Sequence, residues 1–141
     1  MPTRLSAAAF SLAVVLAAVT SALADDAEAP VDCANATSTH DFNICGERAL
    51  EKADSELNAA YAKVLVKVTR DAADPPFDAK TWDAKLRVSQ RAWIAFRDAD
   101  CKELVPMAWT GGSGASAEVL GCLEAKTHAR TKELLERYLL E

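Results

Sequence analysis

Two helix-breaking stretches divide this chain of 141 residues into three segments with helical spacing. The first stretch, "DAADPPF", covers residues 71–77 and contains paired prolines, which cannot continue a helix. The second, "TGGSGAS", covers residues 110–116 and is rich in glycine. Elsewhere apolar residues recur three and four positions apart, and no segment alternates with period two over strand length. The pattern predicts three long helices and no sheet.

The first predicted helix begins at Ser38 or Thr39 and ends before residues 71–77. Ser38 and Asp41 have the spacing of a capping box, which satisfies backbone N–H groups at a helix start. The apolar row of this helix consists of Leu50, Leu57, Tyr61, Val64 and Val68. We expect this row to mark the buried face.

The second helix is expected over residues 78–104, with Asp78 or Thr81 as its cap and Pro106 as its break. Its apolar row is Trp82, Leu86, Trp93 and Phe96. The third helix is expected from Ser116 to the C-terminus, with the row Leu120, Leu123, Thr127, Leu134 and Tyr138. Because short connections join antiparallel neighbours, the predicted fold class is all-α: an antiparallel three-helix, up-down-up bundle.

The first 24 residues have the features of a signal peptide. Arg4 precedes the apolar run "AAAFSLAVVLAAV", which is short for a bilayer span, and "ALA" at residues 22–24 is a small-x-small cleavage site. Cleavage after Ala24 leaves a flexible tail, residues 25–37, and a three-helix domain, residues 38–141. We therefore expect an exported protein with no stable membrane anchor after cleavage.

Four cysteines remain after such a cleavage: Cys33, Cys45, Cys101 and Cys122. In an oxidising compartment they are expected to form two disulfides. An up-down-up topology gathers all four at one end of the bundle. Of the three possible pairings we favour Cys33–Cys45, because the tail can fold back over the first helix. The other pair, Cys101–Cys122, then joins the second and third helices at similar height.

The charge of the chain narrows the class of partner. Without residues 1–24 the chain keeps 15 basic and 21 acidic residues, which gives a formal charge of −6. Such a balance argues against nucleic acid and anionic membrane surfaces and favours a basic partner.

The sequence lacks the patterns of a catalytic or metal site. Its two histidines, His40 and His128, are far apart, and no C-x-x-C, G-x-S-x-G or H-E-x-x-H motif occurs. We therefore expect neither an enzyme nor a bound cofactor or metal.

Charged and amide side chains interrupt the apolar rows. They are Asp54, with Glu47 and Asn58 flanking it, on the first helix, Gln90 and Arg97 on the second, and Arg130 on the third. Burying one charge alone is costly, so these groups are expected to pair. Matching the cysteine heights places Asp54 nearest Arg130, and Arg97 near Glu47 or within a turn of Asp54. We interpret Arg97 as a structural clamp that fixes helix register; contact with a partner is the alternative.

Trp109 stands just before the glycine-rich loop. A tryptophan on a loop is either tucked beneath it or exposed as a binding anchor. The candidate contact surface at this end of the bundle consists of Trp109, Gly111, Gly112 and Ser113.

Three motifs resemble the LprI-like lysozyme inhibitor domain family. They are "DC…C…AD-x-x-LN-x-x-Y" from Asp32 to Tyr61, "L-x-x-x-QRAW-x-x-FRD-x-x-C" from Leu86 to Cys101, and "C-x-x-x-x-T-x-x-R-x-x-x-L" from Cys122 to Leu134, with "GGS" at Gly111. The resemblance covers nearly all of the chain after residue 24. It implies a small, exported, bacterial helical domain with paired cysteines. The family's namesake is a lipoprotein, whereas Cys33 here follows "APVD" and not a lipidation signal.

The resemblance implies a periplasmic or secreted, non-catalytic protein that binds and blocks a basic, lysozyme-type muramidase. The alternative is an envelope interaction module, such as an immunity or assembly accessory protein, with a different protein client.

Overall fold

The computed structural model describes residues 30–139, which contain three long helices and no strand. These are α1 (Thr39–Arg70), α2 (Ala79–Asp98) and α4 (Ala115–Tyr138). The all-α prediction is therefore confirmed. The predicted signal peptide, residues 1–24, and the first part of the predicted tail, residues 25–29, lie outside the described residues. Within residues 30–139, no helix combines the length and apolar character needed to cross a membrane.

Helix α1 begins with the capping box that the sequence predicts. The Asp41 backbone N–H donates to Ser38 Oγ at 3.0 Å, and the Ser38 N–H donates to the Asp41 carboxylate at 3.2 Å. Hydrogen bonding with Ser38, through its side chain and then its backbone, lowers the pKa of Asp41. The helix ends at Arg70, ahead of the paired prolines.

The second helical segment differs from its prediction at its C-terminal end. After Asp98 the chain continues as a π-helix, η1 (Ala99–Leu104), and then as a short helix, α3 (Val105–Ala108). Pro106 was expected to break the chain, yet it lies in the first turn of α3. A proline is tolerated at this position because the first N–H groups of a helix need no intrahelical acceptor. Helical structure therefore reaches Ala108.

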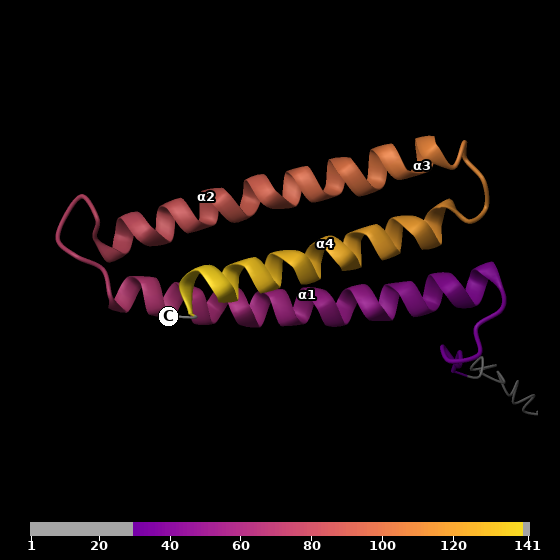
Figure 1. The fold of residues 1–141 in the computed structure, drawn as a ribbon, viewed down its shortest axis with the longest axis horizontal. Helices are drawn as coiled ribbons and strands as arrows, with labels where there is room; N and C mark the ends of the chain where they lie inside the picture. The colour runs from indigo at the N-terminus through magenta and orange to yellow at the C-terminus, as the bar shows by residue number, and fades with distance from the viewer. Residues whose placement is uncertain (1–29, 140–141) are drawn as a thin grey trace, which may run out of the picture.

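The three long helices lie lengthwise beside one another. In Figure 1, α1 and α4 run from right to left, and α2, drawn above them, runs from left to right. The core cluster consists of Leu57, Val64, Val68, Leu86 and Leu134, with Trp93 and Tyr61 packed against it. At the end away from the disulfides, the ring of Trp82 meets Tyr138 edge-on, with centroids 6.3 Å apart.

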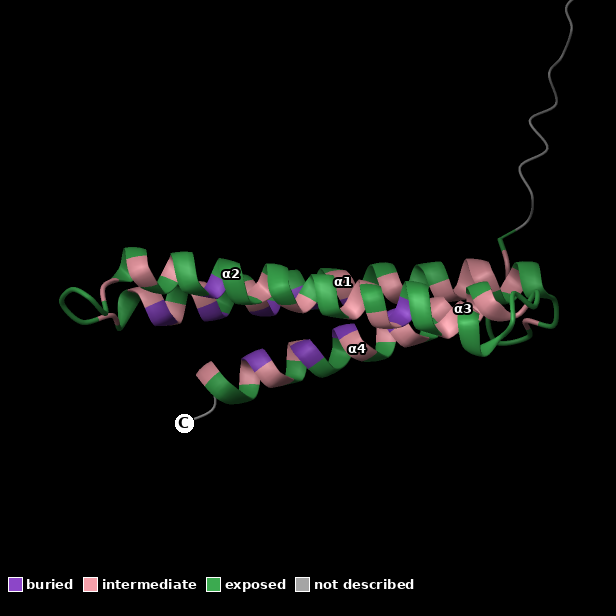
Figure 2. Ribbon diagram, turned by 90° about the horizontal axis from the view of Figure 1, so that it is seen from above, coloured by how far each residue is buried: buried purple, intermediate pink, exposed green. Residues whose placement is uncertain are grey.

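Helix α2 does not bury the whole of its predicted apolar row. Leu86 is buried, but Phe96 is 58% exposed and Trp82 is 37% exposed. Since successive residues of a helix are rotated by about 100°, a face centred on Leu86, Gln90 and Arg97 leaves Phe96 at its edge. Figure 2 shows how few buried residues α2 has compared with α1 and α4.

Candidate functional site

Two disulfides join the cysteines at one end of the bundle. Cys33 pairs with Cys45 and Cys101 pairs with Cys122, each with a Cα–Cα distance of 5.6 Å. The second bond connects η1 to α4, so it ties the end of the α2 segment to the rest of the bundle. We call this region the disulfide end: the first turns of α1 and α4, with η1, α3 and the loop over residues 109–114.

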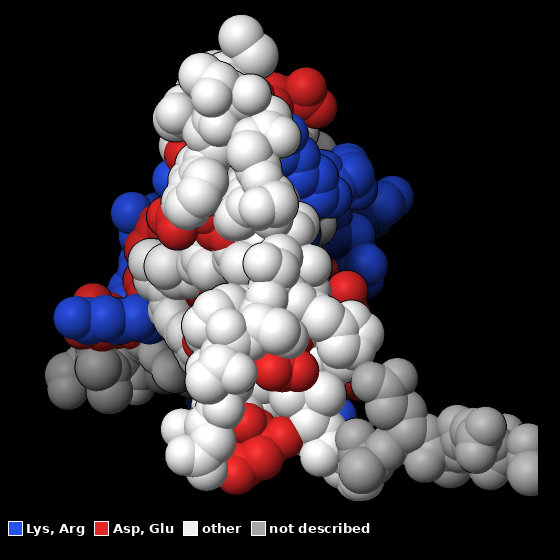
Figure 3. All heavy atoms as spheres, turned by 90° about the vertical axis from the view of Figure 1, so that its right-hand side faces the viewer, with Lys and Arg blue, Asp and Glu red and all other residues white. Residues whose placement is uncertain are grey.

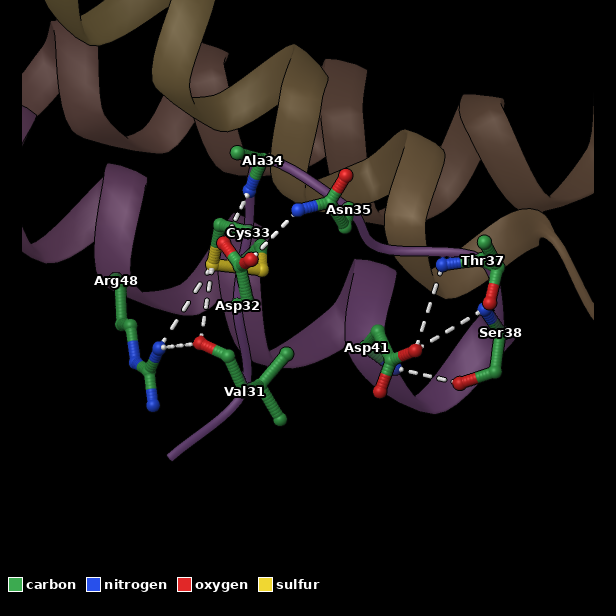
Figure 4. The surroundings of a disulfide bond; sticks show 10 residues. Val31, Asp32, Cys33, Ala34, Asn35, Thr37, Ser38, Asp41 and Arg48 are labelled. Carbon is green, nitrogen blue, oxygen red and sulfur yellow. Dashed lines mark hydrogen bonds between the residues drawn. A yellow bond between two sulfur atoms is a disulfide. The ribbon is translucent and has the colours of Figure 1, made fainter. Parts of the chain in front are cut away.

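The chain before α1 folds against the start of that helix (Figure 4). Asp32 accepts hydrogen bonds from the Ala34 backbone N–H at 3.0 Å and from Asn35 Nδ2 at 2.7 Å. Arg48 of α1 donates to the Val31 carbonyl at 2.9 Å. Residues 31–35 of the predicted tail thus have specific contacts in addition to the Cys33–Cys45 bond.

Trp109 leans over the glycine-rich loop and keeps part of its ring in solvent. The side chain is 42% exposed, and a Cβ added at Gly114 would lie only 2.4 Å from its ring. The loop turns through positive φ at Thr110 and at Gly111. Glycine at position 114 therefore lets the Trp109 ring approach the loop backbone more closely than any residue with a Cβ would allow.

The disulfide end has few basic groups on its outer surface. Figure 3 views this end: uncharged atoms fill most of its centre, acidic side chains lie among them, and Lys and Arg side chains gather along the flanks. Three of the helices that begin here have an acidic residue in the first turn, namely Asp41 in α1, Asp100 in η1 and Glu118 in α4, whereas α3 has none. The end therefore presents an apolar and acidic surface.

Farther along the bundle, Arg97 joins all three long helices. Its Nη1 donates to Asp54 Oδ1 of α1 and to Thr127 Oγ1 of α4, both at 3.0 Å, while its Nε donates to Asp98 Oδ1 at 3.0 Å. The Arg97 side chain is 12% exposed, whereas that of Asp54 is 43% exposed. The guanidinium is thus largely withdrawn from solvent, whereas its partner carboxylate on α1 remains accessible to it.

Arg130 of α4 makes a second set of contacts, about one helical turn beyond Thr127. Its Nε donates to Gln90 Oε1 at 3.2 Å, its Nη2 to Ser89 Oγ at 3.3 Å and its Nη1 to Glu133 Oε2 at 2.8 Å. The Arg130 side chain is 7% exposed. The guanidinium carbons of both arginines lie within cation–π distance of the Trp93 ring, at 5.2 Å for Arg97 and 5.9 Å for Arg130.

We call this set of side chains the polar layer: Asp54, Ser89, Gln90, Arg97, Asp98, Thr127, Arg130 and Glu133. Of the pairings expected from the cysteine heights, Arg97 does lie beside Asp54, with an Nη1–Oδ1 distance of 3.0 Å. Arg130 was expected nearest Asp54 but pairs with Glu133 of its own helix.

Two of the expected residues lie outside the polar layer. Glu47 and Asn58 are exposed on α1 and form no ion pair or hydrogen bond with any residue in the described range. Conversely, the polar layer includes Thr127, which was expected in an apolar row, and three residues that were not expected there, namely Ser89, Asp98 and Glu133. Glu133 has the i, i+3 spacing from Arg130 that favours an ion pair on a helix, so this partner was detectable from sequence.

Among residues 30–139, one set of potential metal ligands comes together, at the disulfide end. Asp100 lies near Cys101 and Cys122, but both sulfurs are bonded to each other and Asp100 pairs with Lys126 at 2.8 Å. His128 lies on the surface, 3.6 Å from Glu56 and from Glu124. The Asp100–Lys126 ion pair thus links η1 to α4, and His128 lies between Glu56 of α1 and Glu124 of its own helix.

The fold and these contacts define a disulfide-linked helical domain with an arginine-centred polar layer. The family described as "Lysozyme inhibitor LprI" matches residues 33–134, and the chain belongs to that family. An uncharacterized protein of Rhizobium meliloti (strain 1021) is 38% identical over 133 residues, which span 92% of this chain and 94% of that relative. No solved structure matches the chain.

Proposed function

We propose that this protein is an exported, periplasmic or secreted inhibitor that binds a basic, lysozyme-type muramidase and blocks its cleft without catalysing a reaction. Membership of the LprI family supports a protein partner of this kind. The observation that carries the proposal is the disulfide end, where a partly exposed tryptophan stands on a loop between covalently linked helices.

The disulfide end suits insertion into a cleft. Trp109 is large, and aromatic anchors contribute a large share of binding energy at many protein interfaces. Its position is set by Gly114 and by the Cys101–Cys122 bond, so little conformational freedom is lost on binding. Gly111, Gly112 and Ser113 add little bulk beside it, which leaves the ring as the most prominent apolar group of the loop.

Charge supports a basic partner. The whole chain has a formal charge of −5, and first-turn acidic residues surround the loop. Opposite charges speed the encounter of two proteins, and salt weakens this effect over a screening length of about 10 Å at 0.1 M. Association with a basic lysozyme is therefore expected to slow as salt rises.

The test measures muramidase activity on cell walls with increasing amounts of the purified, oxidised protein. Inhibition is expected, and Trp109→Ala is expected to weaken it. Trp82→Ala is the matched control, because Trp82 has similar exposure, 37% against 42%, at the opposite end of the bundle. Circular dichroism checks that both variants remain folded.

Undiminished activity at excess protein would remove the inhibitor proposal for the lysozyme tested and favour an envelope interaction module with another client. Inhibition that Trp109→Ala leaves unchanged would instead place the contact on a helical face.

A further inference from the structure

Two open hollows lie end to end along one side of α1. The first, of about 400 Å³, lies between α1 and α2; the second, of about 550 Å³, continues toward the disulfide end. They share Asp54 and Asn58 as lining residues, so they form one groove, which we call the α1–α2 groove. On α1 it runs from Glu47 to Tyr61, which at a rise of 1.5 Å per residue is about 21 Å.

The groove exists because α2 and α4 are placed unequally along α1. Toward the disulfide end, Figure 1 shows α4 between α1 and α2. Leu120 of α4 accordingly lines the second hollow, where no α2 residue does. Farther along, Trp93 and Ile94 of α2 line the first hollow opposite Leu57 and Tyr61.

The groove is lined by six apolar residues interspersed with polar ones, and opposite charges stand at its two ends. Its apolar residues are Leu50, Leu57, Tyr61, Trp93, Ile94 and Leu120. Arg87 and Arg91 stand at one end, and Glu47 and Glu51 stand at the other. Arg87 already pairs with Asp83, with an Nη2–Oδ1 distance of 2.9 Å.

Several polar groups of the groove lack partners within the described chain. Arg91, Glu47, Glu51 and Asn58 form no hydrogen bond or ion pair with any residue from 30 to 139. Asp54 has a bond to Arg97 but remains 43% exposed. The groove thus offers an unpaired cation at one end, two unpaired carboxylates at the other and an amide between them.

We propose that the α1–α2 groove binds an amphipathic helix of a protein partner, as a fourth helix added to the bundle. The apolar lining matches one face of such a helix, and its length matches about four turns. Charge complementarity selects a dipolar helix, with acidic residues near Arg91 and basic residues near Glu47 and Glu51. This surface is separate from Trp109, so the proposal goes beyond lysozyme inhibition and does not depend on it.

The test uses two synthetic peptides of equal composition, each about four turns long with leucines at a and d positions. The dipolar peptide has its glutamates in one half and its lysines in the other; the mixed peptide alternates them. Fluorescence anisotropy of the labelled peptides, titrated with the full oxidised protein, is expected to show about tenfold tighter binding of the dipolar peptide. The indole N–H resonance of Trp93 is expected to shift on binding, with those of Trp82 and Trp109 unchanged.

Charge reversal on the protein completes the test. Arg91→Glu is expected to remove the preference for the dipolar peptide, whereas Lys52→Glu, the same charge change at a residue of α1 that does not line the groove, is expected to preserve it. Equal affinity for both peptides, or equal effects of the two substitutions, would overturn the proposal. So would sedimentation showing a dimer that Arg91→Glu dissociates, because a second copy would then cover the groove.

Discussion

Two contacts hold the bundle together, and they differ in the side chains that form them. In the first, α1 packs against α4; in the second, α2 packs against both. Five residues of α1 and four of α4 are buried, but only Leu86 is buried on α2. Apolar side chains such as Val64 and Leu134 fill the first contact. The second depends on Leu86, on Trp93 and on the two arginines, with the Cys101–Cys122 bond closing its end.

Because the two contacts differ in this way, one is expected to supply most of the stability and the other to fix the register of the helices. Apolar burial is non-directional, so it favours close packing without fixing how one helix slides along another. A guanidinium that must meet a carboxylate, a hydroxyl and an amide at set distances permits far fewer positions. We infer that the α1–α4 contact supplies most of the free energy of folding, while the polar layer and the disulfide position α2.

The largest expected effect comes from the α1–α4 contact. Leu134 is 1% exposed, and Leu134→Ala is expected to lower the free energy of unfolding by about 2–5 kcal/mol, because a cavity forms where neighbours cannot collapse. Leu86→Ala is the matched change on α2, and its cost is expected near the lower end of this range, since α2 can move inward. Urea unfolding measures both. A larger loss for Leu86→Ala would reverse the comparison.

The next effect concerns the covalent link of α2. Replacing both Cys101 and Cys122 by serine is expected to lower the free energy of unfolding by about 3 kcal/mol, because the bond closes a loop with a sequence separation of 21. Hydrogen exchange is expected to quicken in η1 and α3 more than in α1. In the matched variant, with serine at both Cys33 and Cys45, hydrogen exchange in η1 and α3 is expected to stay as in the wild type. Equal loss of protection in α1 would contradict a local role for the link.

The polar layer is expected to have a smaller effect than complete burial would give. Removing Arg97 leaves Asp54, which is 43% exposed and can be hydrated. Arg97→Met and Asp54→Asn, with their double mutant, are expected to show a coupling free energy of about 1–3 kcal/mol in urea unfolding. If both single variants unfold like the wild type but lose partner binding, Arg97 contacts a partner and is no clamp.

The smallest expected effect is a pH dependence at the edge of the polar layer. Hydrogen bonds from Lys102 and then from Arg97 lower the pKa of Asp98 below 3.8. The folded state therefore favours the carboxylate, and this stabilisation is present above pH 3.8 and is lost as pH falls through the lowered pKa. Comparing urea midpoints at about pH 5 and about pH 3, the wild type is expected to lose up to about 1 kcal/mol more than Asp98→Asn. Equal losses would exclude this contribution.

Local signals were enough to predict much of the fold. The Ser38 capping box, the Asp78 cap and the glycine-rich loop each act through the backbone of a few neighbouring residues, and each stands near its predicted place. The cysteine pairs also follow from helix order, because neighbouring helix ends bring Cys101 to Cys122.

Features that depend on the rotation of α2 were not predictable in this way. Apolar spacing alone counted Phe96 as buried, although Arg97 beside it turns inward. The same rotation brings Arg97 of α2 to Asp54 of α1. The π-helix was not predictable either, because spacing rules assume 3.6 residues per turn and a π-helix has a wider turn.

The π-helix η1 also constrains how the length of this chain can change. Deleting one residue between Ala99 and Leu104 would rotate all that follows by about 100° relative to α2. A deletion at Ala99 or Asp100 would then turn Cys101 away from Cys122, and one after Cys101 would turn α3 relative to the disulfide. The connection over residues 71–77 has no such partners to keep in phase. Among relatives, we therefore expect insertions and deletions to collect in that connection and to be missing from η1.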